Sequence, residues 1–246
     1  MNGNKFIVLG ATGGIGSETC RRLRSRGAEL FLVGRSQERL SALAGNLDSP
    51  CQVIDAREID QVEGCIERGL EAMDEVNGIV NCVGSVLLKP AHLTTPEEWN
   101  ETIAINLTSA FATVRAGHKV MRKTGGSIVL MSTAAARVGL PNHEAIAAAK
   151  AGVIGLMQSA AASYASRGIR VNAVAPGLVR TGMTERIWSN EKSAEASRGM
   201  HALGRLGEPR DVASLIDWLL QPENDWVTGQ VFGVDGGLGT LRSSGR

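Results

Sequence analysis

Apolar positions along the chain gather in short runs, and longer amphipathic stretches separate these runs. The runs predict seven strands, at residues 6–9, 30–33, 53–54, 79–83, 128–131, 171–174 and 231–234. Within each run the apolar residues are nearly continuous, whereas a strand with one face in water shows strict alternation. The pattern therefore predicts a parallel sheet that is covered on both faces.

The amphipathic stretches predict helices, at residues 15–26, 36–46, 58–73, 97–123, 143–166 and 209–220. Two of these starts carry capping signals: Ser36 precedes a glutamine and a glutamate, and Thr95 precedes a proline and two glutamates. Strands that alternate with helices indicate βαβ units. We therefore expect an α/β fold, a single doubly wound Rossmann-type domain over residues 1–246, with a sheet of about seven parallel strands and helices on both faces. It includes a polar segment at 182–207 and a tail at 239–246.

Composition and charge argue against several functions. The 246 residues are 43% hydrophobic and 21% charged, as in a globular domain with a substantial core. The formal net charge is +1, so we expect no binding to nucleic acid or anionic lipid, and the arginine-rich run at 21–26 is expected to be a solvated helix face. There is no leader pattern and no run of 18 apolar residues, which predicts a soluble, cytoplasmic protein outside the membrane.

The four cysteines lack the spacing of a metal or disulfide motif. They are Cys20, Cys51, Cys65 and Cys82, with no CxxC pair among them. This argues against a disulfide framework and against a zinc site. We expect buried thiols and no metal centre.

A glycine-rich turn, Gly10-Ala11-Thr12-Gly13-Gly14-Ile15-Gly16, lies between the first predicted strand and the first predicted helix. Glycines there allow a tight turn and a close approach to a pyrophosphate, whose charge is met by free amides and the helix N-terminus. The alternative is an ordinary glycine-rich turn. The spacing Gly10-x-x-x-Gly14-x-Gly16 differs from the usual dinucleotide spacing Gly-x-Gly-x-x-Gly.

This spacing resembles the cofactor loop of the short-chain dehydrogenase/reductase family, and within it that of the 3-oxoacyl-carrier-protein reductases. The resemblance extends over nearly the whole chain, because further family-like motifs follow in the family's order. They are Asn81-Cys82-Val83-Gly84, Ile105-Asn106-Leu107, Val174-Ala175-Pro176-Gly177 with Thr181, Gly204-Arg205-Leu206-Gly207-Glu208-Pro209 and Val234-Asp235-Gly236-Gly237.

The resemblance implies a nicotinamide dinucleotide and a small-molecule substrate. It implies that Gly10, Gly14 and Gly16 seat the pyrophosphate. It further implies that Asn81, Pro176, Gly177 and Thr181 hold the nicotinamide half. The other cofactor-binding candidates are Thr12, Ile15, Ser36, Asp55, Ala56, Val83, Gly84, Lys150 and Val179.

The choice between NAD and NADP can be read from charge. An NAD-binding unit places an acid about 20 residues after the glycines, where it would repel a 2′-phosphate. Here the second strand ends in Val33-Gly34-Arg35-Ser36, without an acid. Arg35 can pair with a phosphate, although it can also be a solvated surface charge. We therefore expect NADP(H) ahead of NAD(H). Asp55 resembles the family's adenine-contacting aspartate, or it caps a helix together with Glu58.

The chain departs from its family at the proton donor. Family members carry a serine and, thirteen residues later, a tyrosine in a Tyr-x-x-x-Lys motif. Alignment without gaps places Thr133 at the serine position, Ile146 at the tyrosine position and Lys150 at the lysine. Isoleucine has no exchangeable proton. The only tyrosine, Tyr164, lies 14 residues after Lys150, about four helical turns away, and is expected to be a helix-surface residue.

Several groups remain as replacements for the phenol. His143 lies one helical turn before Ile146 and has a side chain suited to proton transfer, but a histidine at a helix start is also a common surface or capping residue. Thr133 and the neighbouring Ser132 carry hydroxyls that can orient a carbonyl oxygen. Water or the substrate can also supply the proton.

Lys150 and Asn106 each have two interpretations. Lys150 lies in an otherwise apolar stretch, so it binds a polar partner such as the nicotinamide ribose or points to solvent. The resemblance implies that Asn106 holds a water in a relay to that lysine; otherwise its amide stabilises a helix.

Two segments bear on the substrate and on assembly. The segment at 182–207 resembles the family's substrate lid, and the alternative is a surface insertion. Trp99, Ile103, Leu107, Phe111 and Val114 form an apolar stripe that suits packing. The resemblance implies that this helix and the one with Lys150 pair across a homodimer or homotetramer.

Two functions of different classes remain open. The first is an NADP(H)-dependent oxidoreductase with an atypical site, which transfers a hydride between the nicotinamide and a carbonyl or alcohol. The second is a dinucleotide-binding regulatory or structural subunit that has lost redox chemistry. Ile146 is the position that supports the second.

Overall fold

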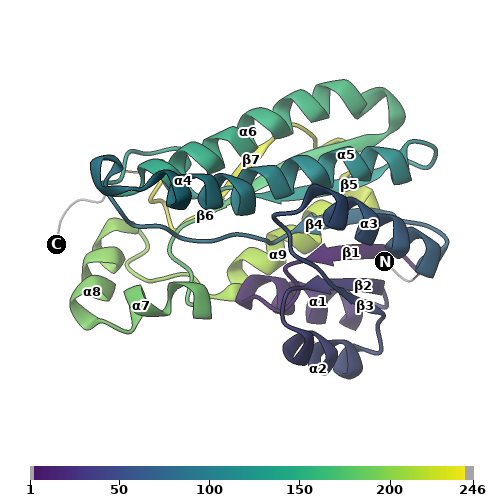
Figure 1. The fold of residues 1–246 in the computed structure, drawn as a ribbon, viewed down its shortest axis with the longest axis horizontal. Coiled ribbons are helices and arrows are strands. Elements are labelled where there is room, and N and C mark those ends of the chain that lie inside the picture. Colours follow the sequence, from purple (N-terminus) through teal and green to yellow (C-terminus); the bar gives the residue numbers. More distant parts are fainter. Residues whose placement is uncertain (1–2, 242–246) are drawn as a thin grey trace.

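A computed structural model describes residues 3–241, and all seven predicted strands are present in one parallel sheet (Figure 1). The sheet order is β3-β2-β1-β4-β5-β6-β7, so the order reverses between β1 and β4. The strands are β1 (Lys5–Leu9), β2 (Glu29–Gly34), β3 (Cys51–Val53), β4 (Gly78–Asn81), β5 (Gly126–Met131), β6 (Ile169–Pro176) and β7 (Val231–Val234). Such a reversal is the point at which open α/β sheets bind ligands.

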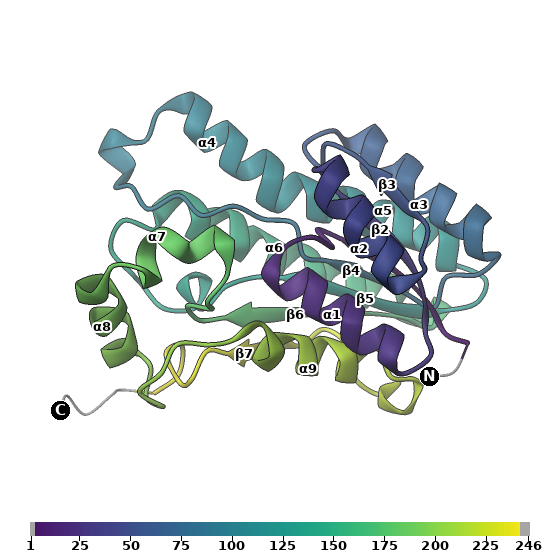
Figure 2. The same ribbon diagram turned by 90° about the horizontal axis from the view of Figure 1, so that it is seen from below.

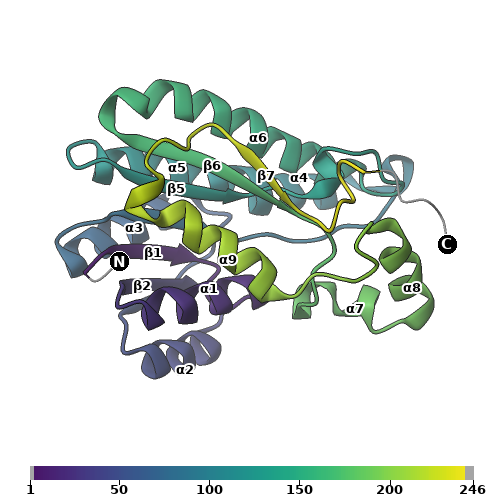
Figure 3. The same ribbon diagram turned by 180° about the vertical axis from the view of Figure 1, so that it is seen from behind.

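Helices cover both faces of this sheet, as the sequence predicts. The α-helices are α1 (Gly14–Ser25), α2 (Gln37–Leu47), α3 (Ile59–Met73), α4 (Pro96–Ile103), α5 (Ser109–Met121), α6 (Glu144–Tyr164), α7 (Glu185–Trp188), α8 (Glu191–Met200) and α9 (Pro209–Leu220). Helices α1 and α9 pack side by side on one face, and α3, α5 and α6 lie on the other (Figures 1 and 3).

The strand β1 places apolar side chains on both faces of the sheet, so both faces must pack against helices. Phe6 and Val8 belong to the apolar core beneath α1 and α9, whereas Ile7 and Leu9 belong to the core beneath α3 and α5. All four side chains are fully buried. Because burial of one large apolar side chain contributes about 1.5–3 kcal/mol, both layers stabilise the sheet.

The stretch at 97–123, predicted as one helix, is interrupted in the structure. Thr95 caps α4 by accepting a hydrogen bond from the Glu98 amide, and the Glu98 carboxylate accepts one from the Thr95 amide. One turn of π-helix at Ala104–Thr108 then joins α4 to α5. Turns of this kind are often found at functional sites.

The arginine-rich run lies largely at the surface, as expected, but two of its members also pair with a buried carboxylate. Arg22 Nε donates to Asp217 Oδ2 in α9 at 2.6 Å, and Arg26 Nη2 lies 3.0 Å from the same oxygen. Asp217 is 1% exposed. A buried carboxylate requires such partners, so the pair fixes α1 against α9.

Other expectations are met in part. Cys20 and Cys65 are buried, but Cys51 and Cys82 are only half-buried. Tyr164 ends α6, where its half-buried ring stacks on that of His118 at 4.5 Å between centroids. Residues 242–246 of the expected tail lie outside the described residues.

Among residues 3–241, one helix is long and apolar enough to cross a membrane: α6 with the 3₁₀ turn that continues it, Glu144–Arg167. This helix packs against β5, β6 and α5. Packing of that kind gives a core helix the same composition, so the finding is weak evidence for a membrane span.

Candidate cofactor and active site

The glycine-rich turn connects the carboxyl end of β1 to α1, directly beside the reversal in strand order. Gly10 has φ +73°, and a Cβ on it would lie 2.8 Å from the Cys82 carbonyl carbon. A Cβ on Gly16 would lie 2.2 Å from the Gly10 carbonyl oxygen. Glycine is therefore required at both positions by the chain itself.

The N-terminus of α1 is free to receive an anion. Gly13 is its N-cap and has no side chain to cap the helix, and the first turn contains no acidic residue. Backbone amides and the helix dipole at such an end favour a phosphate group. The residues present thus fit the diphosphate of a dinucleotide.

A cluster of arginines lies near the carboxyl ends of β2 and β3. Arg35 follows β2 and is exposed, which agrees with a phosphate-binding residue and equally with a solvated surface charge. Arg39, one turn into α2, donates from Nη2 to the Thr12 carbonyl oxygen at 2.7 Å. Its guanidinium therefore lies at the glycine-rich turn, which the sequence did not indicate.

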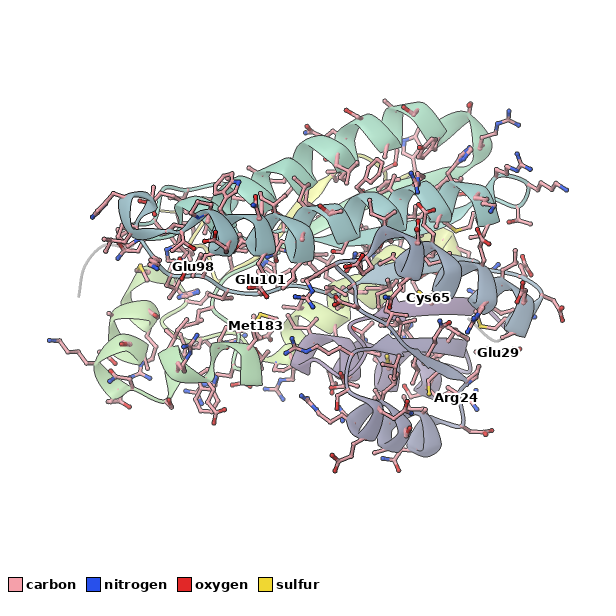
Figure 4. The ribbon with its side chains drawn as sticks, in the orientation of Figure 1. Arg24, Glu29, Cys65, Glu98, Glu101 and Met183 are labelled. Atoms are coloured by element: carbon pink, nitrogen blue, oxygen red, sulfur yellow. The ribbon has the colours of Figure 1, made fainter. Side chains whose placement is uncertain are left out.

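Asp55 does not cap the following helix, so that alternative is wrong. The N-cap of α3 is Glu58, whereas the Asp55 carboxylate accepts hydrogen bonds from the guanidinium of Arg57. These bonds, with a smaller contribution from the charge of Arg35, lower the pKa of Asp55. Arg57 also pairs with Glu101 of α4 at 3.8 Å, and Figure 4 labels Glu101 on that helix.

Asn81 ends β4, but its side chain is used within the protein. Its Nδ2 donates to Thr113 Oγ1 and its Oδ1 accepts from the Val83 amide, both at 2.9 Å. The residue is buried, with 3% of its surface exposed. Asn81 therefore holds the loop after β4 against α5.

Asn106 lies in the middle of the π-helical turn and is 1% exposed. Its Nδ2 donates to the Thr102 carbonyl and to Ser85 Oγ, and its Oδ1 accepts from the Ser85 amide at 3.1 Å. A Cβ on Gly84 would lie 3.1 Å from Asn106 Oδ1 and 3.5 Å from Lys150 Nζ. Three predicted site residues, Gly84, Asn106 and Lys150, are thus brought together.

Lys150 points into the protein rather than to solvent. It is 6% exposed, and its Nζ donates to the Met131 carbonyl at the end of β5, at 2.9 Å. Removal from water lowers the pKa of its ammonium to about 8. Cys82 is half-buried as a residue, but its thiol is removed from water, and this raises the pKa of the thiol to about 12. Cys82 therefore stays protonated at neutral pH. A buried ammonium with one protein partner retains donors for a ligand.

The two hydroxyls after β5 have different surroundings. Ser132 is buried and donates its proton to the Lys150 carbonyl at 3.0 Å, which ties α6 to the sheet. Thr133 is half-buried, and its Oγ1 lies 3.5 Å from the Pro176 carbonyl, a long contact. Thr133 is therefore the hydroxyl with more freedom to meet a substrate.

Ile146 and His143 share the beginning of α6. Ile146 is 5% exposed and lies one helical turn before Lys150. His143 is half-buried at the N-cap, with its Nδ1 2.7 Å from the Pro141 carbonyl. His143 is thus held at the N-terminus of α6, where its Nδ1 donates to the Pro141 carbonyl.

The loop after β6 closes the site from the other side. A Cβ on Gly14 would lie 2.7 Å from Thr181 Cγ2, so Thr181 packs directly on the glycine-rich turn. Pro176 and Val179 are buried, and Val179 pairs with Gly207 in an isolated parallel bridge. The structure therefore brings together the glycine-rich turn, the loop after β6 and the chain at Gly207, which lie far apart in the sequence.

The polar segment at 182–207 contains two short helices, α7 and α8, which the sequence did not predict. Both lie beside the carboxyl edge of the sheet (Figure 2). Met183 is 50% exposed, and in Figure 4 it lies on the side of the molecule where α4 carries Glu98 and Glu101. His201, which follows α8, is instead 3% exposed.

This fold and site define a dinucleotide-binding α/β protein, and comparison with known proteins identifies its family. Residues 10–239 match the family model described as enoyl-(acyl carrier protein) reductase. A 3-oxoacyl-[acyl-carrier-protein] reductase, FabG, from Thermotoga maritima is 34% identical over 248 residues, which cover 97% of this chain and 98% of the relative. The short-chain dehydrogenase/reductase aba4 of Botryotinia fuckeliana is 34% identical, over 95% of this chain and 96% of its own. The chain belongs to the short-chain dehydrogenase/reductase family of oxidoreductases.

Solved structures agree with this assignment. A short-chain type dehydrogenase/reductase from Mycobacterium ulcerans superposes with a TM-score of 0.94 at 27% identity, covering 99% of this chain and 92% of that one. Levodione reductase superposes with a TM-score of 0.93 at 29% identity, covering 98% of this chain and all of that one. The doubly wound fold predicted from the sequence is confirmed.

Proposed function

We propose that the protein is an NADP(H)-dependent oxidoreductase that interconverts a carbonyl and an alcohol, or reduces another polarised double bond. The observation that carries this proposal is the convergence of Gly84, Asn106 and the buried ammonium of Lys150 near the uncapped N-terminus of α1. A buried lysine with one carbonyl partner is costly unless a ligand meets it.

Each part of the site has a separate task in this proposal. A bound nicotinamide supplies or accepts the hydride. The N-terminus of α1 binds the diphosphate, and Lys150 donates hydrogen bonds to the nicotinamide ribose. Thr133 orients the reacting oxygen, and Asn106 holds a water near Lys150.

The preference for NADP(H) over NAD(H) rests on charge. Arg35 follows β2 directly and Arg39 lies in the first turn of α2, near the place where a 2′-phosphate is expected. The nearby carboxylate of Asp55 is paired with Arg57 and so repels a phosphate less. We propose that Arg39 supports Arg35 in phosphate binding.

Proton supply is the unusual step, because Ile146 stands at the position assigned to the family's tyrosine. His143 at the start of α6, water and the substrate remain candidates. We add Lys150 to them, since a pKa of about 8 leaves its ammonium able to give up a proton near neutral pH. Positioning without a strong acid still permits slow turnover.

The test is steady-state oxidation of NADPH and of NADH with a panel of ketones, quinones and enoyl compounds. We expect turnover of at least one acceptor, and a higher kcat/KM for NADPH. Arg35→Ala and Arg39→Ala should each weaken NADPH binding and leave NADH binding almost unchanged. Tight NADPH binding with no turnover of any acceptor would favour the regulatory subunit, for which Ile146 is the supporting observation.

We also propose a homodimer or homotetramer in the cytoplasm. The helices α4 and α5 expose Trp99 and Phe111, which are 42% and 41% accessible in the single chain. Large apolar side chains on neighbouring helices suit a symmetric contact. Light scattering on the purified protein should give two or four times the chain mass of 25.9 kDa, and a monomer would contradict it.

A further inference from the structure

His201 connects α8 to the loop after β6 through both of its ring nitrogens. The ring is 3% exposed. Its Nδ1 lies 2.6 Å from the Ser197 carbonyl, one turn earlier in α8, and its Nε2 lies 3.1 Å from the Leu178 amide nitrogen. The amide can only donate, so Nε2 accepts and Nδ1 carries the proton.

The loop that receives this bond reaches the glycine-rich turn. Backbone bonds also hold this loop: the Gly177 amide donates to the Val234 carbonyl, and the Leu178 carbonyl accepts from the Gly207 amide. Two side chains before α8 bond to it as well, since Thr184 Oγ1 donates to the Val179 carbonyl and Trp188 Nε1 donates to the Thr181 carbonyl at 2.9 Å. Three residues after Leu178, Thr181 packs on Gly14. A movement of α8 is therefore transmitted through His201 to the part of the chain that faces the diphosphate.

The His201 ring is closely packed between two glycines, which restricts its movement. A Cβ on Gly177 would lie 2.5 Å from Nε2 and 3.0 Å from Cδ2. On the other side, a Cβ on Gly236 would lie 3.4 Å from the His201 Cβ. The lack of a side chain at both glycines thus leaves space for the imidazole, and this space holds the ring in the position where Nε2 accepts from the Leu178 amide.

We infer that His201 is a positioning residue that couples α8 to the loop at 176–181, beside the bonds that Thr184 and Trp188 make to that loop, so that the two hold a dinucleotide as one unit. The inference rests on the proposed function for its ligand, but the coupling itself is a property of the protein alone. It assigns to α8 a role in cofactor affinity as well as in covering the substrate.

The first test needs no cofactor and uses a matched pair of variants. In His201→Gln the side-chain oxygen can accept from the Leu178 amide, as Nε2 does. In His201→Asn the shorter side chain can reach only the Ser197 carbonyl. Hydrogen–deuterium exchange of the peptide at 176–182 should quicken about tenfold in the Asn variant and stay near wild type in the Gln variant.

Asn190→Ala controls for a general loss of α8. Asn190 caps the N-terminal end of α8 by accepting from the Ser193 amide, whereas His201 follows the C-terminal end. We expect this variant to quicken exchange in the first turn of α8, away from His201, and to leave the peptide at 176–182 unchanged. Equal effects of Asn190→Ala and His201→Asn on the loop would overturn the inference, as would equal exchange in the Asn and Gln variants.

The second test measures NADPH affinity by calorimetry. His201→Asn should raise the Kd about tenfold, and His201→Gln should restore it to within about twofold of wild type. Wild-type protein that binds no coenzyme would refute the proposed function, while the exchange experiment would still decide on the coupling. Normal NADPH affinity in the Asn variant would refute the role in binding.

A double-mutant cycle tests the steric side of the inference. Gly177→Ala places a methyl group against Nε2 and should displace the ring, so its loop exchange should match that of His201→Asn. With His201→Ala in the background, the two ring contacts are gone and the 3.1 Å approach to Asp235 Cα remains, so the same substitution should add a smaller change than it does in the wild type. Additive effects of the two substitutions would show that Gly177 and His201 act independently.

Discussion

Lys150 provides the sharpest thermodynamic prediction, because its ammonium is buried in an otherwise apolar stretch of α6. Burial lowers its pKa from 10.5 to about 8. Each unit of pKa is worth about 1.4 kcal/mol, so holding this charge inside the folded protein costs roughly 3 kcal/mol at neutral pH. Replacement by methionine removes that cost and also removes the hydrogen bond to the Met131 carbonyl, which is worth about 1 kcal/mol. Lys150→Met should therefore stabilise the apoprotein by about 2 kcal/mol at pH 7.

The sign of the pH dependence follows from the two pKa values. Below pH 8 the lysine is charged in both the folded and the unfolded chain, and the full cost is present. Between pH 8 and 10.5 the folded chain loses the proton while the unfolded chain keeps it, so the wild type gains stability relative to the variant. The advantage of Lys150→Met should fall by about 2 kcal/mol between pH 7 and pH 9.5.

Urea denaturation of the apoprotein at both pH values measures this difference directly. Lys192→Met, at an exposed position in α8, is the matched control and should change the free energy of unfolding by less than about 0.5 kcal/mol at either pH. A variant at position 150 that is less stable at pH 7, or whose advantage is the same at pH 7 and 9.5, would refute the reasoning. The same variant should bind NADPH more weakly, since it lacks the ribose donor.

Three further substitutions test the site and the fold. Ile146→Tyr should create or raise carbonyl reductase activity by up to about 10²- to 10⁴-fold in steady-state NADPH oxidation, because it supplies an acid one turn before Lys150. No gain, with NADPH affinity preserved, would contradict that assignment. His143→Ala should lower kcat if the imidazole supplies the proton, and an unchanged kcat would remove His143 from the mechanism. Thr95→Ala deletes the hydroxyl that caps α4 and should reduce the free energy of unfolding by about 0.5–2 kcal/mol in urea denaturation; a smaller loss would mean that Glu98 alone sustains the cap.

The sequence predicts the sheet well because each strand is a continuous apolar run that no helix period explains. The break between α4 and α5 could not be predicted in this way. Apolar residues at 103, 107 and 111 keep a four-residue spacing across the π-helical turn, so the pattern reads as one helix. Helices α7 and α8 escape prediction because their segment has few apolar positions and no regular period.

Contacts between distant residues limited the prediction of the site. The motif around Asn81 indicates a cofactor contact, but not that its amide also binds Thr113 and Val83 within the protein. Arg35 precedes α2 and Arg39 lies in its first turn, so no helical spacing in the sequence relates the two guanidinium groups. The contact between His201 and Leu178 joins residues 23 positions apart, on either side of α7 and α8, and no local pattern predicts it.

Hydride transfer itself is tested most directly by an isotope experiment. The protein is incubated with NADPH deuterated at C4 of the nicotinamide and with each acceptor of the panel, and the product is analysed by mass spectrometry and NMR. We predict one deuterium on the former carbonyl or alkene carbon of at least one product, with none acquired from D₂O at that carbon. NADPH that binds but leaves every acceptor without deuterium would contradict the account.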